Sequence, residues 1–170
     1  SLMSKIRHVS YAEFQTRLNE AFVSFTKAEP KSYVCLVEPD KSQKWVTQIA
    51  LHQMGLKPEG LLRLGDEAAN GLQYAMDTMP PELRESTKNM VILDDGSFSG
   101  TQMCNNITAA NTLYKTEFNT QEGPHFHVII PFITRTAQAK LQELKTKGVK
   151  LTLHTSVVMK TVDESFPEGK

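Results

Sequence analysis

The sequence has no excess of either charge, because 19 Lys and Arg residues balance 19 Asp and Glu residues among 170. A protein that binds a long stretch of nucleic acid needs a basic face, so an extended nucleic-acid surface is not expected. The chain also contains no hydrophobic run of membrane-spanning length and no signal-peptide pattern before Ser10. We therefore expect a cytoplasmic protein that does not bind membranes.

Cysteine is scarce as well: only Cys35 and Cys104 are present, and they form no CxxC pair. Both lie in apolar or helical stretches, which favours reduced core thiols, with a single disulfide as the alternative. With 39% hydrophobic and 22% charged residues, the composition is typical of one globular domain. We expect this domain to span residues 4–160. Residues 1–3 are expected to be an expression-tag remnant, and residues 161–170 a tail cut from a longer chain.

Apolar runs and helical periodicities alternate along the chain. Runs rich in strand formers predict strands at 33–37, 61–64, 90–93, 126–132 and 149–153. Helical spacing, a capping box and helix stop signals predict helices at about 11–26, 45–54, 66–79, 101–113 and 136–147. Strands that alternate with helices of this length imply crossovers between parallel strands. The predicted fold class is α/β, with a mostly parallel sheet between flanking helices in three layers, a Rossmann-like arrangement.

Two adjacent carboxylates, Asp94 and Asp95, directly follow the apolar run 90–93. In open parallel sheets, ligands bind beyond the carboxyl ends of the strands, and the acid pair falls at that edge. Adjacent carboxylates repel each other and cost desolvation, unless ribose hydroxyls donate to them or Mg²⁺ lies close by. The pair therefore predicts a ribose contact and an indirect role in holding Mg²⁺, through the ribose or through water.

A loop of mostly small residues follows the acid pair: Gly96, Ser97, Phe98, Ser99, Gly100 and Thr101. Its backbone N–H groups and hydroxyls can donate to an anion, and a helix that begins near Gly100 directs its partial positive end there. The acid pair and the loop together predict a site for a ribose 5-phosphate group. The competing interpretation is a solvated turn in which Asp and Ser only cap the helix.

The segment 90–103 resembles the phosphoribosyl-pyrophosphate-binding motif of type I phosphoribosyltransferases. Residues 90–93 match the apolar part, Asp94 and Asp95 the acids, and Ser99-Gly100 the phosphate turn. The resemblance implies a Mg²⁺-dependent glycosyltransferase that moves a phosphoribosyl group from phosphoribosyl pyrophosphate to an unidentified acceptor. Asp94 and Asp95 would be its catalytic pair, since they can steady the ribose as positive charge develops on it.

By the same resemblance, residues 38–45 take the place of the family's pyrophosphate loop. Four residues there would hold the pyrophosphate, with the lysines as point charges and the serine as a donor: Asp40, Lys41, Ser42 and Lys44. An ordinary polar turn, with Ser42 as a helix N-cap, is an equal alternative. Trp45 is expected to be a packing residue rather than one that stacks on a base.

Three departures from the family pattern keep a second class of function open. Gln102 stands where the family often has a second Thr, and neither a flexible hairpin between Leu64 and Asn89 nor a base-selecting hood is evident. The alternative to an enzyme is therefore a non-catalytic ligand-sensing or regulatory module, joined to other domains in a longer chain.

Other site types fit the sequence less well. A haloacid-dehalogenase start is excluded because Leu93 stands where the nucleophilic Asp is required. An actin-like ATPase loop remains a weak alternative, since it needs a hairpin where a helix is predicted. His125 and His127 share one face of a strand and are a candidate metal pair, but no third ligand clusters nearby, so histidines at a strand end are the preferred interpretation.

Overall fold

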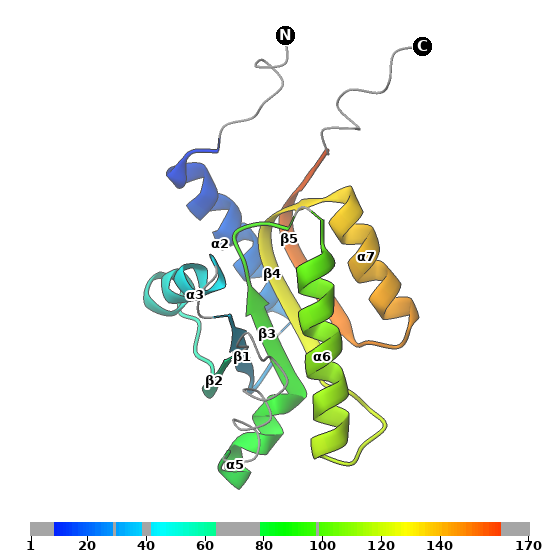
Figure 1. The fold of residues 1–170 in the computed structure, drawn as a ribbon. Coiled ribbons are helices and arrows are strands. Elements are labelled where there is room, and N and C mark those ends of the chain that lie inside the picture. Colours follow the sequence, from blue (N-terminus) through cyan, green and yellow to red (C-terminus); the bar gives the residue numbers. More distant parts are fainter. Residues whose placement is uncertain (1–8, 29, 39–41, 64–78, 98, 161–170) are drawn as a thin grey trace, which may run out of the picture.

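A five-stranded parallel sheet forms the centre of the protein. In the computed structural model, residues 9–160 are described, except residues 29, 39–41, 64–78 and 98. The sheet order is β2-β1-β3-β4-β5, and every neighbouring pair is parallel. The strands are β1 (Val34–Val37), β2 (Gly60–Arg63), β3 (Asn89–Leu93), β4 (His125–Thr134) and β5 (Leu151–Met159). Because all strands run the same way, their carboxyl ends meet at one edge of the sheet (Figure 1).

Helices cover both faces of this sheet. Helices α2 (Tyr11–Lys27) and α3 (Ser42–Gln53) lie on one face, and α6 (Thr101–Glu117) and α7 (Arg135–Thr146) lie on the other (Figure 1). A short helix α5 (Pro81–Arg84) and a 3₁₀ turn η1 (Glu85–Lys88) lead into β3. This arrangement confirms the predicted three-layer α/β fold class. None of the described helices is long and apolar enough to cross a membrane.

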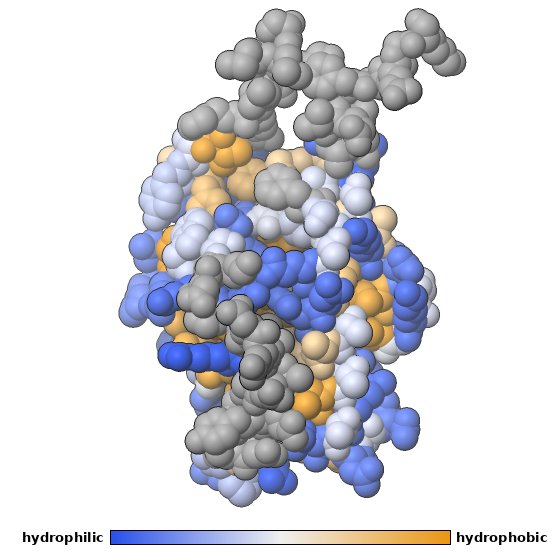
Figure 2. Space-filling model, in the orientation of Figure 1, coloured by the Kyte–Doolittle hydropathy of each residue, from blue (hydrophilic) through white to orange (hydrophobic). Residues whose placement is uncertain are grey.

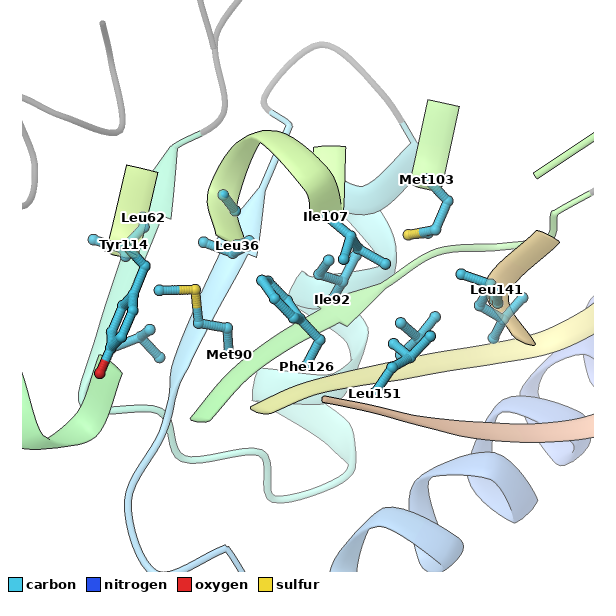
Figure 3. Packing of buried hydrophobic residues seen from close by; sticks show 14 of the residues in the cluster. Leu36, Leu62, Met90, Ile92, Met103, Ile107, Tyr114, Phe126, Leu141 and Leu151 are labelled. Carbon is cyan, nitrogen blue, oxygen red and sulfur yellow. The ribbon is translucent and has the colours of Figure 1, made fainter. Parts of the chain in front are cut away.

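Alternate residues of the central strands feed two separate hydrophobic clusters. Met90 and Ile92 pack toward α6 and α7, where they meet Ile107 (Figure 3), whereas Val91 and Leu93 pack toward α2 and α3. All five are fully buried, which explains why β3 reads as an unbroken apolar run. Burial of one such aliphatic side chain contributes roughly 1.5–3 kcal/mol. β3 is therefore packed firmly on both faces, which also fixes the position of Asp94, the residue that follows it.

The structure extends two predicted strands beyond their predicted ends. β4 continues to Thr134, and β5 continues to Met159 because it pairs with β4 along its whole length, from Leu151 to Met159. The strand β5 lies at the sheet edge and is only partly buried. Its sequence therefore lacks the continuous apolar run that marks an inner strand, and its end could not be predicted. The predicted helix 66–79 falls, apart from Met79, outside the described residues.

Hydrophilic side chains cover most of the face seen in Figure 2, with hydrophobic patches between them. One of these patches lies at the end of the molecule where α2 begins. That end is also where the strands terminate and α6 starts (Figure 1).

Candidate functional site

The acid pair lies at the carboxyl end of β3, the central strand of the sheet. The Asp94 N–H donates to the carbonyl of Ile129 on β4 at 3.2 Å, which continues the parallel ladder one residue past Leu93. The backbone of Asp94 is thus fixed by the sheet, and its side chain projects beyond the strand end. This is the edge at which open parallel sheets bind ligands.

Asp94 is a partly buried carboxylate with two donors and no described cation. Its Oδ1 accepts from Ser42 Oγ at 2.5 Å and from the Asp95 N–H at 2.9 Å. Burial raises the pKa of Asp94 to about 6, the neighbouring Asp95 adds to the rise, and the Ser42 hydroxyl opposes it. No Lys, Arg or His among the described residues forms an ion pair with it. Hydrogen-bond donors from a ligand would favour the charged form of this carboxylate and so offset the cost of its burial.

The loop after the acid pair is anchored to β4. The Ser97 N–H donates to the Phe132 carbonyl at 3.1 Å, and the Thr134 N–H donates to the Ser97 carbonyl at 3.0 Å. Ser97 thereby forms a parallel bridge with Ile133 and is itself buried. Phe98 lies outside the described residues. The loop is consequently a fixed extension of the sheet edge rather than a free connection.

Gly100 forms the sharp turn into α6. Its φ of +72° is left-handed, and a Cβ at this position would lie 2.8 Å from the Ala137 Cα on α7. The helix begins at Thr101 with no side-chain cap from Gly100 and no acid in its first turn, and the Thr101 N–H donates to Ser99 Oγ at 3.3 Å. The start of α6 lines a cavity of about 200 Å³ through Gly100, Gln102 and Met103, together with Asp94 and Gly96. Since β3 leads through a loop into a helix, the actin-like hairpin is wrong for this segment.

Only part of the predicted pyrophosphate loop can be placed. Asp40 and Lys41 lie outside the described residues. Ser42 is the first residue of α3, and its hydroxyl contacts the acid pair across 52 positions of sequence. Lys44 is exposed on the same helix and forms no ion pair with a described residue. The structure thus brings Ser42 to the acid pair and leaves Lys44 at the surface.

Two contacts around the start of α6 have no signal in the sequence. Lys140 of α7 donates from Nζ to Thr101 Oγ1 at 2.8 Å, which places a positive charge beside the first turn of α6. Gln102 Nε2 lies 2.9 Å from both carboxylate oxygens of Glu38, at the end of β1. Gln102 is therefore bound to Glu38, whereas Lys140 and Thr101 line a separate cavity between α6 and α7.

Three histidines gather on the α2 side of β4 and β5, away from this edge. The rings of His125 and His127 stack at 4.3 Å, and His127 Nδ1 lies 3.3 Å from Nε2 of His154. Ser24 of α2 contacts the other ring nitrogen of His154 at 2.9 Å. The sequence did not connect His154 with the other two. Among the described residues, no three His, Cys, Asp or Glu side chains are placed to hold a metal ion.

This histidine cluster predicts that acid destabilises the fold. Burial is the main cause that lowers the pKa of His127 and of His154 to about 4, from an ordinary value near 6.5. Between those pH values the unfolded chain takes up protons that the folded chain does not. The contribution of the two histidines to the free energy of unfolding is therefore fully present above pH 6.5 and decreases toward pH 4. Asp94 opposes this loss, because its pKa is raised on folding. We expect His154→Gln to narrow the difference in Tm between pH 7.5 and pH 4.5, and the exposed His52→Gln to leave it unchanged. An unaltered difference in His154→Gln would contradict the prediction.

Comparison with known proteins adds three findings. The family model described as PRTase-CE matches residues 1–167. No curated protein matches the chain. Among solved structures, a hypothetical protein from Neisseria gonorrhoeae with bound ppGpp is similar, with a TM-score of 0.54, 11% identity, and coverage of 89% of this chain and 82% of that chain. At that identity the likeness concerns the fold alone.

Proposed function

Because the chain belongs to the PRTase-CE family, a phosphoribosyltransferase-type family, we propose that its acid-pair site binds phosphoribosyl pyrophosphate with Mg²⁺ and transfers the phosphoribosyl group. One observation carries this proposal: the Asp94 carboxylate, partly buried and without a described cation, opens onto the same cavity as the N-terminus of α6. A ligand with hydroxyls at one end and a phosphate at the other can donate to the carboxylate and accept from the N-terminus of α6 at the same time.

Each part of the site has a distinct task in this proposal. Asp94 and Asp95 accept hydrogen bonds from the ribose hydroxyls, while the first N–H groups of α6 hold the 5-phosphate. During transfer the bond from C1 to the pyrophosphate oxygen breaks, and its electron pair leaves with the pyrophosphate. The acceptor's lone pair forms the new bond to C1. The fixed negative charge of the acid pair stabilises the positive charge that develops on the sugar.

Magnesium fits this donor set. Mg²⁺ is commonly held by one or two carboxylates together with substrate phosphate oxygens and water, so it does not need a closed cage of protein ligands. The adjacent carboxylates Asp94 and Asp95 supply such a partial set. When bound, the ion would neutralise charge on the leaving pyrophosphate.

Isothermal calorimetry tests the binding, with phosphoribosyl pyrophosphate titrated into the protein in the presence and absence of Mg²⁺. We expect saturable binding that strengthens with Mg²⁺, together with pyrophosphate release once a suitable acceptor is present. Ribose 5-phosphate serves as the matched ligand, because it keeps the ribose and the 5-phosphate but lacks the leaving group. If neither ligand bound, the proposal would be overturned.

A ligand-sensing module on the same fold is the second candidate. It is favoured by Gln102, which stands where the family often has a phosphate-binding Thr and whose amide is bound to Glu38. The similar Neisseria protein has ppGpp bound, which supports a phosphorylated nucleotide as the sensed ligand. Tight binding without pyrophosphate release, across a broad panel of acceptors, would favour this candidate over the enzyme.

A further inference from the structure

Gln43, near the start of α3, is a buried polar side chain of which the fold uses only one end. Its exposed fraction is 2%, and its Oε1 accepts from the Glu38 N–H at 3.1 Å. Because a backbone N–H can only meet an acceptor, this contact fixes which end of the amide is the oxygen. The Nε2 end carries two N–H donors and forms no hydrogen bond with any described residue. The donor half of the amide is therefore unpaired in the folded protein.

The unpaired end of Gln43 opens onto the cavity of about 200 Å³ at the acid pair, which we call the small cavity. Gln43 lines this cavity together with Asp94 and the start of α6. Nε2 is not among the described atoms that are completely enclosed without a partner, so the little surface that Gln43 retains includes this donor. An unmade hydrogen bond of a nearly buried donor costs stability, and an acceptor on a ligand would remove that cost.

An anion in the small cavity depends on uncharged donors. Asp94 is the only charged residue among the described lining residues, so no described cation faces the cavity. The Nε2 of Gln102, which also lines it, is already bound to both carboxylate oxygens of Glu38. Gln43 belongs to α3 and the first turn of α6 lies on the opposite face of the sheet. The two therefore offer donors to the cavity from opposite sides.

The position of the small cavity decides which group of the ligand the Gln43 amide meets. Gln43 does not line the larger cavity of about 470 Å³ on the other side of the acid pair, where Tyr11 and Asp95 lie. Lys44, the next residue of α3, lines neither cavity. By its place in the sequence, within 38–45, Gln43 would be expected at the pyrophosphate. The structure instead puts its amide in the cavity that the start of α6 lines.

We propose that Gln43 Nε2 donates a hydrogen bond to the 5-phosphate and so binds it from the face of the sheet opposite α6. This inference rests on the proposed function, in which the first N–H groups of α6 hold the same phosphate. A hydrogen bond from an amide N–H to a charged phosphate oxygen is stronger than one to a hydroxyl. Gln43 is thereby a specificity-determining residue, which favours a sugar with a 5-phosphate over one with a free 5-hydroxyl.

NMR of the unaltered, ¹⁵N-labelled protein tests the contact directly, because the side-chain amide of Gln43 gives its own pair of signals. Ribose 5-phosphate is titrated first, since it carries the 5-phosphate and lacks the pyrophosphate, and ribose serves as its phosphate-free counterpart. We expect ribose 5-phosphate to shift the Gln43 amide proton signals downfield and saturably, and ribose to leave them in place. Gln48 is the internal reference, because it is exposed on the same helix and contacts His52.

Substitutions measure how much the contact contributes to affinity. Gln43→Glu keeps the size of the side chain and the acceptor for the Glu38 N–H, but it replaces the donor by a negatively charged oxygen. We expect its affinity for ribose 5-phosphate to fall at least tenfold to a hundredfold, as calorimetry would measure. Gln48→Glu adds the same charge to an exposed part of the helix and should change the affinity little. Gln43→Met removes the donor without adding charge, so it replaces Gln43→Glu if that variant does not fold.

The outcomes separate this inference from the proposed function. If ribose 5-phosphate binds while the Gln43 signals stay in place and the variants keep their affinity, the inference is overturned and the proposed function stands. Signals that respond to phosphoribosyl pyrophosphate but not to bound ribose 5-phosphate would assign the amide to the pyrophosphate and also overturn the inference. If ribose 5-phosphate shifts the signals and phosphoribosyl pyrophosphate does not bind, the Gln43 contact stands and the proposed function is overturned. Absence of binding by both ligands would overturn both.

Discussion

Replacement of Asp94 by Asn is expected to weaken the binding of phosphoribosyl pyrophosphate and, at the same time, to make the unliganded protein more stable. Asn has the same shape as Asp, and its Oδ1 can still accept from Ser42 Oγ and from the Asp95 N–H. What it removes is a negative charge that burial and the neighbouring Asp95 disfavour, as the raised pKa of Asp94 shows.

The size of both effects follows from the charge. Loss of hydrogen bonds from the ribose hydroxyls to a charged acceptor costs about 1.5–3 kcal/mol, so we expect affinity to fall roughly tenfold to a hundredfold. A pKa raised to about 6 corresponds to a penalty at neutral pH that we discount to about 1–2 kcal/mol, because Asp94 is only partly buried. For a chain of this length that is an increase in Tm of roughly 2–8 °C.

The pH dependence makes the stability part of this prediction sharper. Asp94 is ionised in the unfolded chain above about pH 4, but in the folded protein only above about pH 6. The wild type therefore loses stability relative to Asp94→Asn as pH rises through this range. The stability gap should be largest at pH 7.5 and small at pH 4.5. The histidine cluster is common to both proteins and cancels in the comparison.

Two control variants accompany Asp94→Asn. Asp94→Glu keeps the buried charge and should bring no stabilisation, whereas Glu143→Gln removes an exposed carboxylate paired with Lys147 and should change neither quantity appreciably. Thermal melts measure stability, and calorimetry with phosphoribosyl pyrophosphate and Mg²⁺ measures affinity. A destabilised Asp94→Asn with unchanged affinity would contradict the interpretation of the acid pair.

The sequence could predict the acid pair and its loop because all of that information is local. An apolar run that is buried on both faces, two acids and a run of small residues lie within 14 positions, and β3 and α6 form where this pattern places them. The resemblance to the phosphoribosyltransferase motif rests on the same segment. Such short-range patterns predict the folded structure well, because each depends only on residues that are neighbours in the sequence.

The remainder of the site depends on contacts between elements that are distant in sequence. Ser42 reaches Asp94, and Lys140 reaches Thr101, only because α3 and α7 pack at particular rotations on opposite faces of one sheet. Nothing in the local pattern of α2 indicates that Tyr11 lies beside the acid pair. Sheet order and helix rotation are decided by packing of the whole core, which no single segment encodes.

Gly100 has a left-handed backbone conformation and also lies close against α7. We therefore expect Gly100→Ala to cause the largest loss of stability among single substitutions at this edge. A left-handed conformation costs a residue with a Cβ about 1–2 kcal/mol. The added Cβ would also lie 2.8 Å from the Ala137 Cα, which is backbone that cannot rotate away. Overpacking of this kind costs about 1–3 kcal/mol more.

Gly148→Ala provides a matched control for the two causes. Gly148 also has a left-handed φ, of +94°, but a Cβ there would meet nothing within 4 Å. It should therefore show the conformational cost alone, roughly half of the destabilisation in Gly100→Ala, as measured by urea unfolding. Because relief of the clash has to move the start of α6 away from α7, Gly100→Ala should also lose affinity for ribose 5-phosphate, while Gly148→Ala keeps it. Equal destabilisation in both variants, with ligand affinity intact in both, would show that the contact of α6 with α7 does not position the phosphate site.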